Sequence, residues 1–127
     1  MSLDISPLIP TGRQVIQSYR AGIFRISQVD YAGPVIVLPE RTLTWAAPAF
    51  GDLNAAHFDP IREAGIEVQV LLLGCGNKML LPSSSLRQAM KTLGIVIEAM
   101  DTGAACRTFN VLMGEDRKVA AALLPAT

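Results

Sequence analysis

The chain has 127 residues, of which 50% are hydrophobic and 17% are charged, and its 11 basic residues are balanced by 11 acidic ones. This length suits one domain spanning residues 1–127, in which we expect residues 1–12 to be irregular. The even charge balance argues against a nucleic-acid-binding protein and against a polybasic membrane surface, since both need an excess of Lys and Arg. No apolar run approaches the roughly 18 residues of a transmembrane helix. The first residues also lack the basic start and apolar stretch of a signal peptide, so we expect a cytoplasmic protein without direct membrane insertion.

The first half of the sequence is rich in β-prone residues and turn signals. Two β-prone runs flank Ala21-Gly22, which predicts a β-hairpin. The YAGP segment at residues 31–34 is a second turn signal. Short strands are expected at residues 35–39 and 42–47. In the second of these strands, alternation places Trp45 on the same face as two apolar residues, so we expect Trp45 to be at least partly buried.

A helix is expected within Asn54–Ala64, where Asp59-Pro60 resembles an N-cap followed by Pro in the first turn and Gly65 is a natural stop. The nearly continuous apolar run at residues 67–74 is typical of a strand that is buried on both faces.

The second half alternates strands with helices. Apolar residues recur at helical spacing after the serine run, at Leu86, Ala89, Met90 and Leu93. Ser85 fits a capping box with Gln88, although Ser83 or Ser84 can also serve as the cap.

The order continues as a strand at 95–100, a helix at about 103–113 capped by Asp101 or Thr102, and a strand at 118–124. This βαβ organisation predicts that the strands at 67–73 and 95–100 are parallel neighbours. Ligands of such sheets usually bind at the carboxyl ends of the strands.

The Gly74-Cys75-Gly76 loop should lie at that edge. It lacks the third glycine and the immediate helix of a dinucleotide-binding loop, and it lacks the Gly-Lys-Ser/Thr ending of a P-loop. Two interpretations stay open. The glycines permit a tight turn and close packing, or the loop forms a non-standard anion nest of backbone N–H groups.

Arg107 and Asn110 share one face of the expected helix because they are three residues apart. An arginine near a helix N-terminus and a glycine loop can clamp an anion. The alternative is that its guanidinium pairs with a carboxylate such as Asp101 or caps loop carbonyls. The candidate binding crevice therefore consists of Gly74, Cys75, Gly76, Arg107 and Asn110.

No catalytic or metal-binding constellation is evident elsewhere. His57 is the only histidine and has no partner at a metal-ligand spacing. Cys106 near a helix N-terminus suits either a reactive thiol or a small core residue. No carboxylate pair fits general acid–base catalysis, and no cofactor is indicated.

Several motifs resemble a family of small, mostly uncharacterised α/β proteins that are related to the mitochondrial complex I (NADH:ubiquinone oxidoreductase) assembly factor 3. The matching motifs are the Gly-x-Gly loop at 74–76, Met-Asp-Thr at 100–102, Arg-Thr-aromatic-Asn at 107–110 and a basic-Val-small ending at 118–120. The resemblance covers nearly the whole chain and is most specific from Leu71 to Pro125. The loop centre departs from the family, because Cys75 stands where Thr is common, which puts a family-wide activity of Cys75 in doubt.

The resemblance implies a single three-layer α/β domain with a mixed central sheet, helices on its faces and an additional β-hairpin. It implies no established enzyme activity. For mitochondrial members it implies a role in assembling the proton-pumping NADH:quinone reductase, with membrane association through partners. This chain has no Arg-rich transit peptide, so we expect a bacterial protein.

Two functional interpretations follow. The first is a non-enzymatic assembly or chaperone-like protein whose partners are other proteins, such as subunits of a respiratory membrane complex. The second is a small-molecule or anion-binding domain, or an undiscovered enzyme, that uses the crevice near Gly74–Gly76 and Arg107. An exposed apolar patch outside the crevice favours the first, and a concave pocket with convergent polar groups favours the second.

The cysteine usage yields a first prediction. We expect Cys75 and Cys106 to be reduced and unbonded in the folded protein, because two cysteines in a chain of this size form no disulfide framework. Thiol titration under denaturing, non-reducing conditions should detect both. Finding no free thiols would contradict this expectation.

Overall fold

A computed structural model describes residues 9–126 of the chain. Most of the segment expected to be irregular, residues 1–12, lies outside the described residues, and the expectation of a single domain stays a prediction. The described strands are β1 (Ile16–Ser18), β2 (Ile23–Ile26), β3 (Val29–Ala32), β4 (Val35–Val37), β5 (Thr42–Thr44), β6 (Val70–Cys75), β7 (Val96–Met100) and β8 (Val119–Leu124). The helices are α1 (Asp59–Glu63), α2 (Ser84–Thr92) and α3 (Thr102–Gly114), with short 3-10 turns η1 (Phe50–Asp52) and η2 (Ala55–Phe58).

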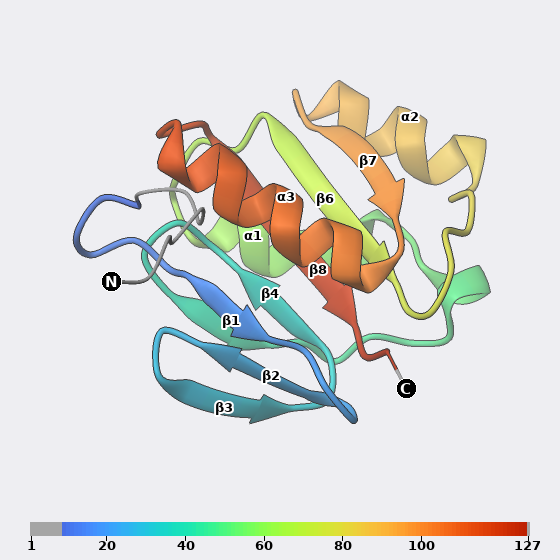
Figure 1. Cartoon of the computed structure of the whole chain (residues 1–127). Coiled ribbons are helices and arrows are strands. Elements are labelled where there is room, and N and C mark those ends of the chain that lie inside the picture. Colours follow the sequence, from blue (N-terminus) through green and yellow to red (C-terminus); the bar gives the residue numbers. More distant parts are fainter. Residues whose placement is uncertain (1–8, 127) are drawn as a thin grey trace, which may run out of the picture.

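The central sheet has five strands in the order β5-β4-β8-β6-β7 (Figure 1). β6 runs parallel to both β7 and β8, whereas β4 runs antiparallel to β8 and β5. The predicted parallel pairing is confirmed, with Val70 opposite Val96 and Leu73 opposite Ala99. The sheet is therefore mixed, as expected.

Each face of the central sheet has its own apolar core. On one face, alternate strand residues such as Ile36, Leu71 and Leu73 pack with α1 and α2. On the other face, the intervening residues Val37 and Leu72 pack with α3 and with a separate three-stranded sheet of β1, β2 and β3, which we call the small sheet. Figure 1 shows α3 in front of the sheet and α1 behind it. The predicted three-layer α/β architecture is confirmed, and it follows from the period-two alternation of the strands.

The predicted hairpin is present and is extended by one strand. β1 and β2 pair antiparallel around Ala21-Gly22, which adopt φ values of 52° and 76°. β2 then pairs antiparallel with β3 through a turn at Ser27-Gln28, which also has positive φ values, 48° and 74°. Positive φ values usually occur at glycine, so the sequence Ser27-Gln28 gives no signal for this turn. A hydrogen bond to β1 supports this turn, because the Gln28 N–H donates to Gln17 Oε1 at 2.8 Å.

Side-chain caps begin the longer helices. Ser83, one of the three candidates, caps α2 by accepting from the Leu86 N–H at 3.1 Å. Asp101 caps α3 by accepting from the Ala104 N–H at 2.9 Å. Asp59 is not the cap of α1, because the helix already begins at Asp59 and Phe58 is the N-cap. The 3-10 turn η2 comes directly before α1 and is capped by Asn54.

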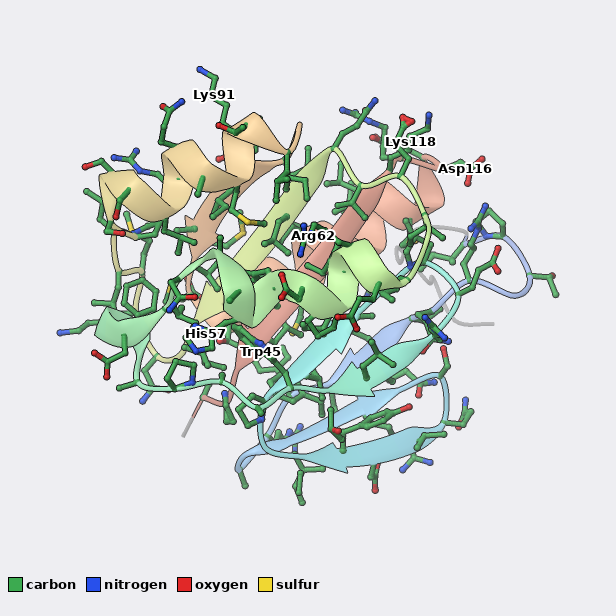
Figure 2. The ribbon with its side chains drawn as sticks, turned by 180° about the vertical axis from the view of Figure 1, so that it is seen from behind. Trp45, His57, Arg62, Lys91, Asp116 and Lys118 are labelled. Carbon is green, nitrogen blue, oxygen red and sulfur yellow. The ribbon has the colours of Figure 1, made fainter. Side chains whose placement is uncertain are left out.

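Trp45 is buried, as predicted, with 5% of its surface exposed. Its ring lies 5.4 Å from that of Phe58, centroid to centroid, and its Nε1–H donates to the His57 carbonyl oxygen at 2.8 Å. Figure 2 shows Trp45 beside His57. Trp45 thus joins the end of β5 to η2 on the α1 face of the sheet.

The burial of Trp45 predicts its energetic weight. Trp45→Ala should lower the free energy of unfolding by roughly 3–5 kcal/mol, since it removes a large core side chain. Thr44→Ala is the matched control, because Thr44 precedes Trp45 at the end of β5 and its side chain is exposed, and it should change stability by no more than about 0.5 kcal/mol. Urea unfolding measures both. Equal effects of the two substitutions would contradict the assigned packing.

Candidate functional site

The Gly-Cys-Gly loop is joined to the start of α3 by one buried hydroxyl. The Gly76 N–H donates to Thr102 Oγ1 at 2.8 Å, and that hydroxyl donates to the Leu124 carbonyl oxygen at 2.6 Å. In return, the Thr102 N–H donates to the Gly76 carbonyl oxygen at 2.9 Å. Thr102 is fully buried. The loop and the helix start therefore face each other, as the sequence predicted.

Steric constraints explain why both positions of the loop are occupied by glycine. A Cβ at Gly74 would lie 2.9 Å from Leu123 Cδ2 and 3.0 Å from Thr102 Oγ1, closer than real contacts allow. Gly76 has a φ of +93°, a conformation that side chains disfavour. These constraints favour the tight-turn interpretation. The Gly76 N–H, which an anion nest would need, is already used by Thr102.

The two cysteines are free, buried and on opposite faces of the central sheet. Burial raises the pKa of the Cys75 thiol, whose Sγ lies 3.5 Å from the carbonyl oxygens of Leu73 and Leu80. Burial also raises the pKa of Cys106 to about 12, and this outweighs the opposing effect of the Arg107 charge. Since the thiolate is the nucleophile, this environment favours the core interpretation of Cys106.

Asn110 and Arg107 both reach towards β1 and the residue after it. Asn110 Oδ1 accepts from the Ile16 N–H at 2.9 Å, and its Nδ2 donates to the Ile16 carbonyl oxygen at 2.8 Å. Arg107 is exposed, and its Nη1 donates to the Tyr19 hydroxyl at 2.9 Å. Within residues 9–126, Arg107 forms no ion pair with a carboxylate. The hydrogen-bond partner of the loop is therefore Thr102, whereas Asn110 is hydrogen-bonded to β1.

The described part of the molecule has hollows at both ends of the central sheet. A small apolar one of about 240 Å³ lies beside the segment that follows the loop, and its lining includes Phe50, Leu81 and Leu86. A larger one of about 480 Å³ lies at the opposite end of the central sheet, between the turns at 38–41, 64–67 and 116–118. Sequence reasoning missed the larger hollow. The sequence signal for it was a set of charged residues in three turns, which the strand order of the sheet brings to one end.

No helix within residues 9–126 has both the length and the apolar character to cross a lipid bilayer. The same residues contain no group of three or more His, Cys, Asp and Glu side chains arranged to hold a metal ion. His57 Nδ1 instead accepts a hydrogen bond from the Asn54 N–H at 3.0 Å.

Comparison with known proteins gives the family. Residues 16–124 match the family described as "Protein of unknown function (DUF498/DUF598)", and the chain belongs to it. The chain is 34% identical over 110 residues to NADH dehydrogenase (ubiquinone) 1 alpha subcomplex assembly factor 3 of Rattus norvegicus, which covers 87% of this chain and 60% of the relative. The human relative of the same name is 32% identical with the same coverage. The resemblance to this assembly factor is therefore confirmed, although the chain spans about 60% of the length of these relatives.

Bacterial proteins match over more of their length. An uncharacterised protein of Rhodobacter capsulatus is 34% identical over 90% of this chain and 86% of its own. A crystal structure from Bordetella parapertussis is 32% identical, with a TM-score of 0.80 and coverage of 91% of this chain and 98% of that one. A solution structure from Bordetella pertussis, described as a Mth938-like domain, is 27% identical with a TM-score of 0.78 over 98% of this chain and 92% of the other. The fold is that of the Mth938-like domains.

The contacts of α3 predict opposite outcomes for its two polar residues. Asn110→Ala should lower the free energy of unfolding by roughly 1–3 kcal/mol, because it leaves two partly buried backbone groups of Ile16 without partners. Arg107→Ala should stay within about 0.5 kcal/mol of the parent, as for other exposed positions. Urea unfolding of the pair measures the difference. Marked destabilisation by Arg107→Ala would show a structural role and remove Arg107 from the candidate crevice.

Proposed function

We propose that this protein is a non-enzymatic assembly or chaperone-like protein that binds subunits of a respiratory NADH:quinone reductase-type membrane complex during its maturation. The names of its relatives support this role. In this proposal the protein works in the cytoplasm and reaches the membrane through its partners. Its own surface must then carry a site for other proteins.

The observation that carries the proposal is an exposed apolar surface on the segment after the Gly-Cys-Gly loop. Leu81 is 70% exposed and Met79 is 57% exposed, and the partly exposed Phe50 lies at the adjoining hollow. We call Phe50, Met79 and Leu81 the loop patch. Exposed apolar side chains that gather on one surface often mark a site where another protein binds.

The segment that carries Met79 and Leu81 of the loop patch is held in place at both ends. Before it, the loop is fixed by the hydrogen bonds between Gly76 and Thr102. After it, the Ser83 side chain accepts from the Leu86 N–H and starts α2. A surface that is ordered before binding loses less conformational freedom when a partner binds. The tight turn therefore positions the binding surface, although the turn itself does not contact the partner.

A second candidate function uses the crevice of Gly74, Cys75, Gly76, Arg107 and Asn110 to bind an anion or small molecule. The exposed guanidinium of Arg107, which has no carboxylate partner among the described residues, favours it. The engaged Gly76 N–H and Asn110 side chain weigh against it. We therefore rank this function second.

The test is complementation in the native host. Deleting the gene should reduce the amount of fully assembled NADH:quinone reductase on a native gel, and the parent gene should restore it. Leu81→Glu should fold but fail to restore assembly, since it places a charge in the apolar contact. Val111→Glu is the matched control, because Val111 is an exposed apolar residue, at 45%, on α3 away from the loop patch.

The outcomes separate the two functions. An unchanged amount of complex after gene deletion would contradict the assembly role. Restoration by Leu81→Glu together with failure of Arg107→Ala would move the function from the loop patch to the crevice. Circular dichroism confirms that each variant is folded.

A further inference from the structure

Three turns meet at the end of the central sheet that lies opposite the loop patch. The turn at 38–41 is closed by a hydrogen bond from the Leu38 N–H to the Arg41 carbonyl oxygen at 2.8 Å. The turn at 115–118 is fixed to β6 because the Lys118 carbonyl oxygen accepts from the Gln69 N–H at 2.9 Å. The third turn, 64–67, follows α1. Together they surround the hollow of about 480 Å³, which we call the turn cleft.

The turn cleft has an apolar part. Leu38 and Pro39 are buried beneath it, Ala64 is half-buried, and Ile66 is 44% exposed at its wall. An exposed isoleucine beside buried apolar residues gives a ligand a surface on which to place a hydrocarbon portion. Pockets for small molecules commonly combine such apolar walls with a few polar groups, in volumes of roughly 300–1,000 Å³.

The carboxylates that line the turn cleft are all paired. Arg13 lies between two of them, with Nη1 3.3 Å from Glu40 Oε1 and Nη2 3.2 Å from Asp116 Oδ1. Lys118 Nζ lies 2.8 Å from Glu67 Oε2. Figure 2 shows Asp116 and Lys118 together at this end of the molecule. No lining carboxylate is left to attract a cation.

Two lining arginines remain. Within residues 9–126, the Arg41 side chain forms no hydrogen bond or ion pair. Arg117 Nη1 lies 3.7 Å from Glu115 Oε1, which is longer than a hydrogen bond, and Glu115 does not line the turn cleft. Counting all lining residues, four cations face three carboxylates. The available charge in the turn cleft is therefore positive and is carried by guanidinium groups.

We propose that the turn cleft binds an organic anion, in which a carboxylate or phosphate group is attached to a short apolar portion. Arg41 and Arg117 bind the anionic group, since a guanidinium matches the planar, bidentate geometry of carboxylate and phosphate oxygens. The apolar portion lies against Ile66 and Ala64. This site shares no residue with the loop patch or with the Gly-Cys-Gly crevice, so it can be tested independently of the proposed assembly role.

The experiment is an NMR titration of the isotope-labelled protein with four probes. Hexanoate and hexyl phosphate carry the two anionic groups on the same apolar chain. Hexylammonium carries the opposite charge, and inorganic phosphate lacks the apolar portion. At least one of the hexyl anions should give saturable amide shifts confined to 38–41, 64–67 and 115–118, and the tighter of the two identifies the preferred anionic group.

The variant Arg41→Ala/Arg117→Ala should weaken binding of that anion by roughly tenfold or more, because it removes both charge-assisted contacts to the anionic group. Arg20→Ala/Arg87→Ala is the matched control, since both arginines are exposed and neither lines the turn cleft, and it should bind as the parent does. Unchanged spectra away from the cleft show that the variants are folded.

Three results would overturn the proposal: no saturable shifts with either hexyl anion, equal binding of hexylammonium, or unchanged affinity in the Arg41/Arg117 variant. Inorganic phosphate should bind more weakly than hexyl phosphate. Equal affinity of these two probes would overturn the role assigned to the apolar wall.

Discussion

The hydroxyl of Thr102 is the contact on which the arrangement of this molecule depends. It is buried, it accepts from the loop after β6, and it donates to the end of β8, so it joins two strands to the first turn of α3. A buried hydroxyl without partners would be costly, and here one group satisfies both its donor and its acceptor capacity. The close approach is possible only because Gly74 has no side chain at this point. Further along α3, Asn110 then attaches the small sheet to this fixed helix.

This arrangement separates rigid architecture from available surface. The glycine loop, which looks like a binding motif in the sequence, is occupied by internal hydrogen bonds. The surfaces that remain available lie elsewhere: apolar side chains just after the loop, and the exposed guanidinium groups of Arg41 and Arg117 at the other end of the sheet. The Gly-Cys-Gly loop therefore serves mainly to position the residues around it, although its glycines resemble those of a binding motif.

The sequence predicted the elements whose periodicity is strong. The apolar run of β6, the helical spacing around Met90 and the cap at Asp101 all correspond to observed features, because local patterns determine them. The family resemblance predicted the layers. The turn at Ser27-Gln28 escaped prediction because it has positive φ values without a glycine, and its contact with Gln17 on β1 is not visible in the local sequence.

The candidate site was harder to predict because its contacts are distant in sequence. Asn110 meets Ile16 across 94 residues and Arg13 meets Asp116 across 103. No local pattern indicates that the amide of Asn110 is used by backbone groups, or that charged turns far apart in the chain surround one cleft. Residue type and spacing placed Arg107 on one helix face with Asn110, but its neighbour Tyr19, the residue after β1, followed only from the packing.

The position of β8 has a consequence for how the chain folds. β8 is the last described strand in sequence, yet it lies in the middle of the central sheet, paired with β4 on one side and β6 on the other. The β4–β5 hairpin and the β6–α2–β7 unit share no strand pairing, so neither can complete the sheet before β8 arrives. Pairings between such distant segments require a large loop to close, which slows folding. During synthesis, the β4–β5 hairpin and the β6–α2–β7 unit would therefore keep unpaired strand edges until β8 is made. Pairing of β8 with both would then be a late and cooperative step in folding.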